Sequence, residues 1–190
     1  MPIWAHIFPL HGWQAAAVVV ATQFLASYAV NLISYNSLSR IYRYFRPREF
    51  ERNGLFYQEH FSIKGWKDHV PAVGSFDKKH LTKSKLTDEY ISQYLLEGLR
   101  AELCHLGAII LSFAVLFATI PSQWLIIIGY SALLNSPCIM IQRYNRPRFE
   151  KMLRSRDENG QIVLVTFWIE EDGTILSGRE ERRKRKNKRF

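Results

Sequence analysis

A glutamate and a histidine, Glu102 and His105, stand three residues apart where a polar segment gives way to an apolar one. On a helix this spacing places both side chains on one face. A histidine oriented by a carboxylate is a general base that can take the proton of an alcohol. The alternative is structural, with Glu102 paired to an arginine. Because ionisable groups inside an apolar span are costly, we predict His105 as a catalytic base and Glu102 as its orienting residue.

Two arginine-rich segments each follow an apolar run, and they align at an offset of one hundred residues. The early collar, residues 41–51, reads IYRYFRPREFE, and the late collar, residues 141–150, reads IQRYNRPRFE. Guanidinium groups bind phosphate or carboxylate through paired hydrogen bonds, and they also anchor helix ends at anionic membrane surfaces. We predict anchoring for the early collar. For the late collar the residues alone leave both roles open, anchoring or substrate binding by Arg143, Asn145, Arg146 and Arg148.

The charge of the chain is segregated, although the mean hydropathy is only −0.14. Lys, Arg, Asp and Glu are absent from residues 1–39 and 103–142. Within these regions, residues 15–33, 103–120 and 124–141 are long and apolar enough to cross a bilayer. The pattern therefore predicts a mainly α integral membrane protein with one N-terminal span followed by a helical hairpin.

The positive charges set the predicted orientation. Every Lys and Arg lies between residues 40 and 100 or from residue 143 onward, and the net charge is +9. The positive-inside rule then predicts a multi-pass protein of the cell membrane, with the N-terminus outside and both the polar middle region, 36–100, and the C-terminus in the cytoplasm. A cleaved signal peptide is the alternative for the first span, but no Lys or Arg precedes the apolar run.

The polar middle region is predicted to be α+β. Residues 56–68 have strand-like and turn features, residues 73–81 resemble a basic loop, and residues 86–102 predict an amphipathic helix capped by Thr87. Near the C-terminus, Gly173 stands in a turn between two apolar runs, which predicts a short β-hairpin. The predicted domains are a membrane domain, 1–156, a hairpin extension, 157–178, and a basic, disordered tail, 179–190.

Several other functions lack support in the sequence. It contains no glycine-rich phosphate loop, serine elbow or metal-ligand spacing. The basic tail has no accompanying nucleic-acid-binding fold, so we expect anionic lipid and not nucleic acid as its partner. Both cysteines, Cys104 and Cys138, stand in apolar runs and are expected to be thiols.

Four blocks resemble, in the same order, the glycosyl-4,4'-diaponeurosporenoate acyltransferase family of staphyloxanthin-type carotenoid biosynthesis. The resemblance extends over roughly residues 40–155, and its most specific block is QRYNRPR at 142–148. The other three are Phe61-Ser62-Ile63 with Trp66-Lys67, Lys79-His80-Leu81, and Arg100-Ala101-Glu102-Leu103 with His105.

The resemblance implies a membrane O-acyltransferase that esterifies the glucose C6 hydroxyl of a glycosylated carotenoid acid, in the last step of the pathway. It implies no cofactor, because the fatty acyl donor, on coenzyme A or acyl-carrier protein, is a substrate. Lys64, Trp66 and Lys67 then join the expected substrate-binding residues. Two alternatives remain: a non-enzymatic membrane adaptor for anionic lipid or a partner enzyme, and an acyltransferase for another lipid-linked sugar. The oligomeric state is not indicated.

Overall fold

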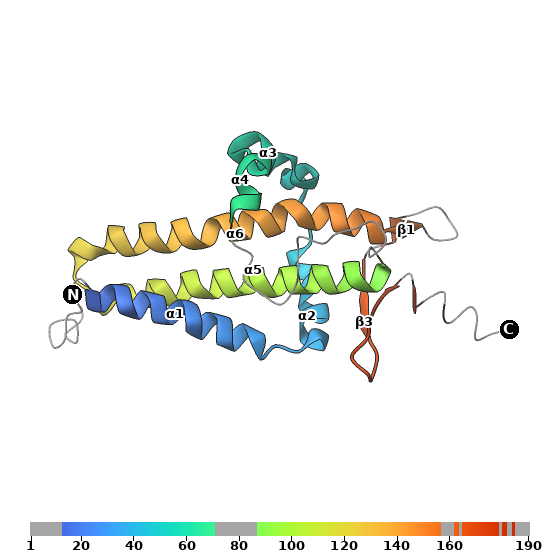
Figure 1. Ribbon diagram of the computed structural model, residues 1–190, viewed down its shortest axis with the longest axis horizontal. Helices are drawn as coiled ribbons and strands as arrows, with labels where there is room; N and C mark the ends of the chain where they lie inside the picture. The colour runs from blue at the N-terminus through green and yellow to red at the C-terminus, as the bar shows by residue number, and fades with distance from the viewer. Residues whose placement is uncertain are drawn as a thin grey trace. The chain divides into compact units, whose positions relative to one another are not determined.

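The computed structural model describes residues 13–70, 87–156, 162–163, 165–178, 180–181 and 184. The chain forms two compact units (Figure 1). The apolar unit comprises residues 1–33 and 100–140, and the polar unit comprises residues 34–99 and 141–190. Two long helices, α5 and α6, contribute residues to both units. The predicted basic loop, 73–81, and most of the predicted disordered tail lie outside the described residues.

Three helices build the apolar unit: α1 (Trp13–Asn31), the second half of α5 (Asp88–Leu116) and the first half of α6 (Trp124–Leu153). A short 3₁₀ turn, η7 (Pro121–Gln123), joins α5 to α6. Figure 1 shows α1 alongside these helices, and its Ala15 and Val19 pack against Val115 and Ile127. The three predicted apolar spans are therefore confirmed as helices, with a helical hairpin after the first.

The outer surface of the apolar unit is rich in large apolar side chains. Leu125, Leu133 and Phe24 are 83%, 77% and 73% exposed. Soluble monomers rarely expose so much contiguous apolar surface, whereas a bilayer covers it. By length and composition, the three helices can each cross a membrane.

Arg100 caps the C-terminal end of α1. Its Nη1 donates to the carbonyl oxygens of Val30 (3.3 Å) and Asn31 (3.2 Å), which have no partner within the helix. A cation at this end also opposes the negative end of the helix dipole. The last turn of α1 itself contains no basic residue, so α5 supplies the charge.

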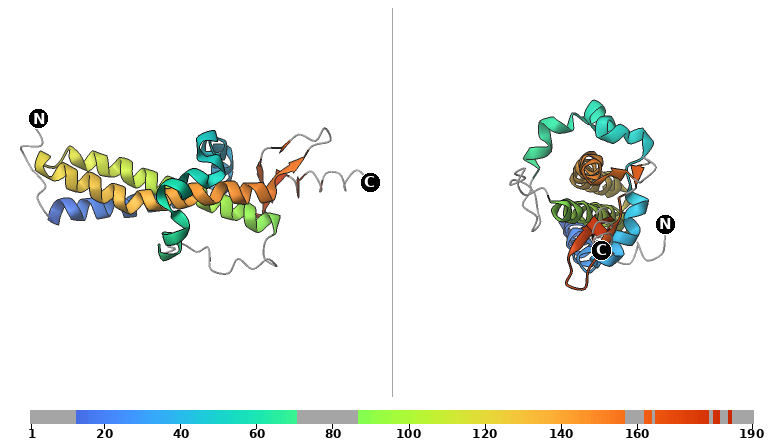
Figure 2. Two further views of the ribbon diagram at one scale, coloured as in Figure 1. Left: turned by 90° about the horizontal axis from the view of Figure 1, so that it is seen from above. Right: turned by 90° about the vertical axis from the view of Figure 1, so that its right-hand side faces the viewer.

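The polar unit begins with short helices: α2 (Tyr35–Ile41), η2 (Tyr42–Phe45), η3 (Glu49–Gly54), α3 (Leu55–Phe61), α4 (Ile63–Trp66) and η4 (Lys67–His69). Figure 2 shows them curving around the part of α6 that belongs to this unit. The predicted helix of the middle region is confirmed, because α5 begins at Asp88 and Thr87 Oγ1 accepts a hydrogen bond from the Tyr90 amide at 3.1 Å.

The strand-like prediction for residues 56–68 is wrong. Two short helices, α3 and α4, occupy this segment, and Ser62 separates them with a φ of 48°. A run of aromatic and β-branched residues fits a short buried helix as well as a strand, because it is too short to show a period. Within residues 34–70 and 87–99 the structure contains no strand to pair with. The described middle region is therefore α, not α+β.

The strands lie near the C-terminus. The predicted hairpin is confirmed: β3 (Phe167–Ile169) pairs antiparallel with β4 (Ile175–Ser177), and Gly173 in the turn has a φ of 87°. An additional pair, β1 (Ser155–Arg156) with β2 (Ile162–Val163), directly follows α6 and was not expected. The predicted division into domains at residues 156 and 178 stays a prediction.

Gly54 is predicted to be intolerant of substitution. Its φ is 88°, and a Cβ there would lie 2.8 Å from the backbone oxygen of Tyr144. We expect Gly54→Ala to lower the free energy of unfolding by roughly 2–5 kcal/mol, because left-handed strain adds to a backbone clash. Denaturant unfolding in detergent measures the change.

Substitutions at two other glycines separate the two causes of the expected loss of stability, backbone strain and the clash with Tyr144. Gly173 shares the positive φ but has open space around it, so Gly173→Ala reports strain alone. Gly65 lies in α4 with nothing within 4 Å, so Gly65→Ala should be nearly neutral. A Gly54→Ala loss no larger than that of Gly173→Ala would show that the contact with Tyr144 is loose.

Candidate functional site

The apolar unit contains a histidine held by an asparagine. The Nδ1 atom of His105 on α5 lies 2.9 Å from Oδ1 of Asn135 on α6. Asn135 is only 1% exposed, whereas His105 is half-buried. The pair is surrounded by helices that carry no charged residue between Leu103 and Gln142. A titratable ring in such surroundings can work with little competition from water.

The contacts of Asn135 determine the tautomer of His105. Asn135 Nδ2 donates to the backbone oxygen of Ser131 at 2.8 Å, so its Oδ1 must face the imidazole. An amide oxygen only accepts hydrogen bonds, so His105 Nδ1 carries the proton. In the neutral ring Nε2 is then the basic atom. This is the arrangement that a general base requires: one nitrogen oriented by a partner and the other available to take a proton.

Glu102 lies one helical turn before His105 and is 1% exposed. Its neighbour Cys104 forms a side-chain hydrogen bond with Ser27 of α1. Together with Gln23 and Asn31, Ser27 belongs to the polar stripe on α1. Gly107 faces α1, since a Cβ there would lie 3.7 Å from the Ala26 Cβ, an ordinary van der Waals contact. Both cysteines are thiols, as predicted, and neither is in a disulfide.

In the polar unit, hydrogen bonds and an ion pair join the early collar to the late collar. Arg146 is 3% exposed and donates to the backbone oxygen of Phe45 at 2.6 Å, and Arg143 donates to the same oxygen at 3.4 Å. Arg143 also lies 3.6 Å from Glu51. The early collar, predicted as an anchor, thus supplies acceptors for Arg143 and Arg146, whereas Arg148 donates to the Tyr144 oxygen at 2.7 Å.

Two buried carboxylates of the polar unit complete this network. Glu51, 1% exposed, accepts hydrogen bonds from the Tyr57 hydroxyl and the Arg48 amide, each at 2.6 Å. Glu150, 4% exposed, accepts from the Tyr42 hydroxyl at 2.8 Å. Burial, and then the nearby Glu150 charge, raise the pKa of Tyr42 well above its ordinary value, so its hydroxyl stays a donor.

The remaining predicted binding residues differ in how freely they could meet a ligand. Arg148 is exposed and stacks on the Tyr144 ring, 3.5 Å from its centre. Lys64 is exposed, whereas Lys67 pairs with Asp68 at 2.7 Å and Trp66 Nε1 donates to the Phe61 oxygen at 2.7 Å. Asn145 forms a hydrogen bond with Tyr94. Of the predicted set, Arg148 and Lys64 are the most accessible to an anionic substrate.

Sequence reasoning missed the partner of His105. Asn135 stands thirty residues further along the chain, on a different helix. One signal was available: Ser131 and Asn135 are four apart, so two polar groups share a face of an otherwise apolar span. A buried polar residue in such a span marks a site by default.

Comparison with known proteins gives one consistent result. The family model described as glycosyl-4,4'-diaponeurosporenoate acyltransferase matches residues 41–155. A protein of that name from Staphylococcus aureus strain USA300 is 33% identical over 126 residues, which is 63% of this chain and 74% of the relative. One from the bovine strain RF122 / ET3-1 is 31% identical over 123 residues, 62% and 72% respectively. No solved structure matches significantly.

Proposed function

Because this chain belongs to the glycosyl-4,4'-diaponeurosporenoate acyltransferase family, we propose that it is a membrane acyltransferase that esterifies the sugar of a glycosylated carotenoid acid. The acceptor of this reaction is glycosyl-4,4'-diaponeurosporenoate, and the acylated group is the C6 hydroxyl of its glucose. The observation that supports the proposal best is the His105–Asn135 pair, which offers a base in an apolar unit where a lipid-bound sugar could reach it.

The proposed reaction needs one base, which takes a proton from the sugar hydroxyl and then passes it to the leaving group. His105 Nε2 takes the proton of the sugar hydroxyl as the oxygen attacks the carbonyl carbon of an acyl thioester. The ester C–O bond forms, the C–S bond breaks, and the imidazolium returns the proton to the leaving thiolate. Asn135 positions the ring, and Glu102, one helical turn before His105, is the second residue that we assign to orienting it.

The proposed donor is a fatty acyl group on coenzyme A or acyl-carrier protein. Both carriers are anionic, and the exposed Arg148 and Lys64 of the polar unit are the residues we assign to their attraction. Arg143 and Arg146 are engaged by Phe45 and Glu51, which favours a role in holding the collars together.

Reconstitution tests the proposed function. The purified full-length protein is placed in liposomes with glycosyl-4,4'-diaponeurosporenoate and hexadecanoyl-coenzyme A, and products are identified by mass spectrometry. We expect the acylated glycoside to form and the free thiol to be released in equal amount. Acylation of a simple glycolipid but not of the carotenoid glycoside would assign the enzyme to another lipid-linked sugar.

The proposed orientation in the cell membrane leaves the polar unit and the C-terminus in the cytoplasm. Two exposed positions test it in a background with Cys104 and Cys138 replaced by serine: Ser122 in η7 and Lys64 in α4. In intact cells we expect an impermeant maleimide to label Ser122→Cys, whereas Lys64→Cys should react only after permeabilisation. The opposite pattern would invert the topology.

A further inference from the structure

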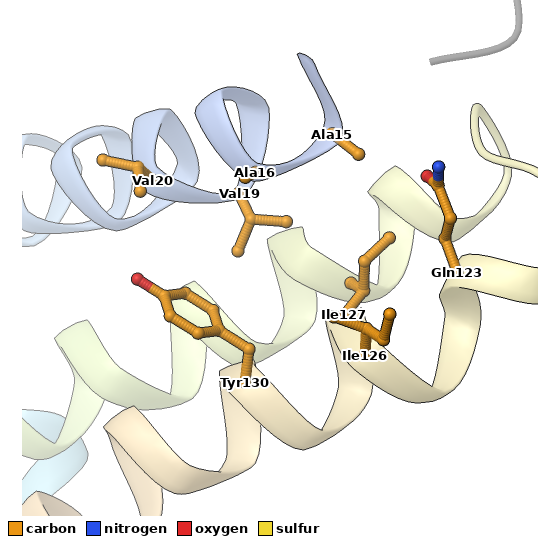
Figure 3. Close-up of a pocket in the computed structure, with 8 residues that line it drawn as sticks. All are labelled: Ala15, Ala16, Val19, Val20, Gln123, Ile126, Ile127 and Tyr130. Carbon is orange, nitrogen blue, oxygen red and sulfur yellow. The ribbon is translucent and has the colours of Figure 1, made fainter. Parts of the chain in front are cut away.

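Among its described residues the apolar unit has two grooves that share Ile127 in their linings. One, of about 310 Å³, lies between α1 and α6, and Figure 3 shows Val19 and Tyr130 pointing toward each other in it. The other, of about 250 Å³, lies between α5 and α6 and is lined mainly by apolar atoms. Its walls include Ile109, Ser112 and Phe113 from α5, and Ser131, Ala132 and Ser136 from α6. We call it the serine groove.

One buried hydroxyl in the serine groove has no hydrogen-bond partner in the part of the chain that the structure describes. Ser131 is 3% exposed, and its Oγ makes no hydrogen bond among the described residues. The equally buried Ser112 differs, because its Oγ donates to the Ala108 oxygen at 2.8 Å. A buried hydroxyl without a partner is destabilising unless a bound ligand or water completes its hydrogen bonding.

The serine groove adjoins the His105–Asn135 pair. Ser131 lies one turn before Asn135, and its backbone oxygen accepts a hydrogen bond from Asn135 Nδ2. Ser136 is the next residue after Asn135. On α5, Ile109 lies one turn after His105. A ligand in this groove therefore has one end beside the proposed base.

We propose that the serine groove binds the acyl chain of the donor, with Ser131 Oγ donating a hydrogen bond to its thioester carbonyl; this rests on the function proposed above. In an acyl thioester the reactive carbon is the end of the hydrocarbon chain. In a carotenoid glycoside a sugar ring separates the polyene from the reactive hydroxyl, so the polyene need not lie beside His105. Because a cavity of about 150 Å³ holds benzene, the serine groove has room for roughly ten carbons of the chain.

Photocrosslinking locates the chain without requiring turnover. The full-length protein in liposomes is exposed to hexadecanoyl-coenzyme A carrying a diazirine on its acyl chain, and the labelled peptides are sequenced. We expect labels on α5 near Ile109 and Phe113, removed by excess unmodified donor. Labels on α1 near Ala16 would place the chain in the other groove, and labels that resist competition would show only surrounding lipid.

Groove-filling variants give a second, kinetic test. Ala132→Phe should lower kcat/KM for hexadecanoyl-coenzyme A about 10-fold or more relative to octanoyl-coenzyme A, because the longer chain meets the added ring. Leu125→Phe, on the same helix but 83% exposed and outside both grooves, should preserve the ratio. A shift of chain-length preference in Ala16→Phe but not in Ala132→Phe would overturn the assignment.

Ser131→Ala distinguishes a role of the hydroxyl in binding the acyl donor from its effect on the stability of the fold. Removing an unpartnered buried hydroxyl should raise the Tm of the ligand-free protein, whereas losing the contact with the thioester should weaken photolabelling and raise the KM for every donor. A higher Tm with unchanged labelling and KM would show that Ser131 has no ligand. If labelling behaves as expected but the carotenoid glycoside is not acylated, the groove is assigned correctly and the proposed acceptor is wrong.

Discussion

His105→Ala is expected to lower the kcat of acyl transfer by about 10³-fold, because a positioned general base contributes a factor of that order. The variant leaves Oδ1 of the buried Asn135 without the imidazole, at a cost of about 1–3 kcal/mol, so activity is compared at equal amounts of folded, inserted protein. Product formation per mole of protein, measured in liposomes, gives the effect. His60→Ala is the matched control: His60 is exposed on α3, and its Nδ1 lies 2.9 Å from the Phe56 oxygen.

Asn135 has a different expected effect, because it acts through the ring and not on the substrate. Asn135→Ala should reduce kcat less than His105→Ala does, since the imidazole is still present but the amide no longer fixes its orientation. Combining both substitutions should cost little more than His105→Ala alone. Full activity of His105→Ala at normal protein levels would remove the imidazole from the chemistry.

The apolar helices were predictable from the sequence because long runs of apolar residues without charge are easy to recognise in composition alone. Spans of 15–33, 103–120 and 124–141 correspond to α1 and to the apolar parts of α5 and α6. The cap at Thr87 and the turn at Gly173 were also predictable, because each depends on one side chain and its own backbone. Partners across helices were not, and Asn135 is the example: the sequence shows that it is polar but not which helix it faces.

The two collars show how tertiary structure overrides a shared sequence. Arg-Pro-Arg occurs in both, at 46–48 and at 146–148. In the early copy Arg46 is extended, with a ψ of 153°, as is usual before proline, and the helix ends. In the late copy the helix continues through Pro147 to Leu153, although proline removes the hydrogen bond to the Arg143 carbonyl. Contacts with the early collar offset that loss, and sequence alignment of the copies could not reveal them.

Glu51→Ala is expected to destabilise the polar unit by roughly 3–5 kcal/mol, which is the effect of removing one partner from a buried ion pair. The substitution leaves the Tyr57 hydroxyl, the Arg48 amide and the Arg143 guanidinium without the carboxylate they face. Denaturant unfolding in detergent gives the magnitude. Glu59→Ala is the control on the same segment: Glu59 pairs with Arg52, both side chains are about half exposed, and removing an exposed pair should cost about 1 kcal/mol or less.

The same variant determines what the late collar does. If the role of Arg143 is to join the two collars, Glu51→Ala and Arg143→Met should show a coupling energy of about 1 kcal/mol or more in a double-mutant cycle of unfolding free energies. Arg143→Met should then reduce stability while leaving the KM for the acyl donor unchanged. If Arg143 instead binds the anionic donor, the KM rises and the coupling with Glu51 vanishes. Equal stability losses for Glu51→Ala and Glu59→Ala would show that the contacts of Glu51 do not hold the two collars together. The arginines of the late collar would then be available to bind substrate.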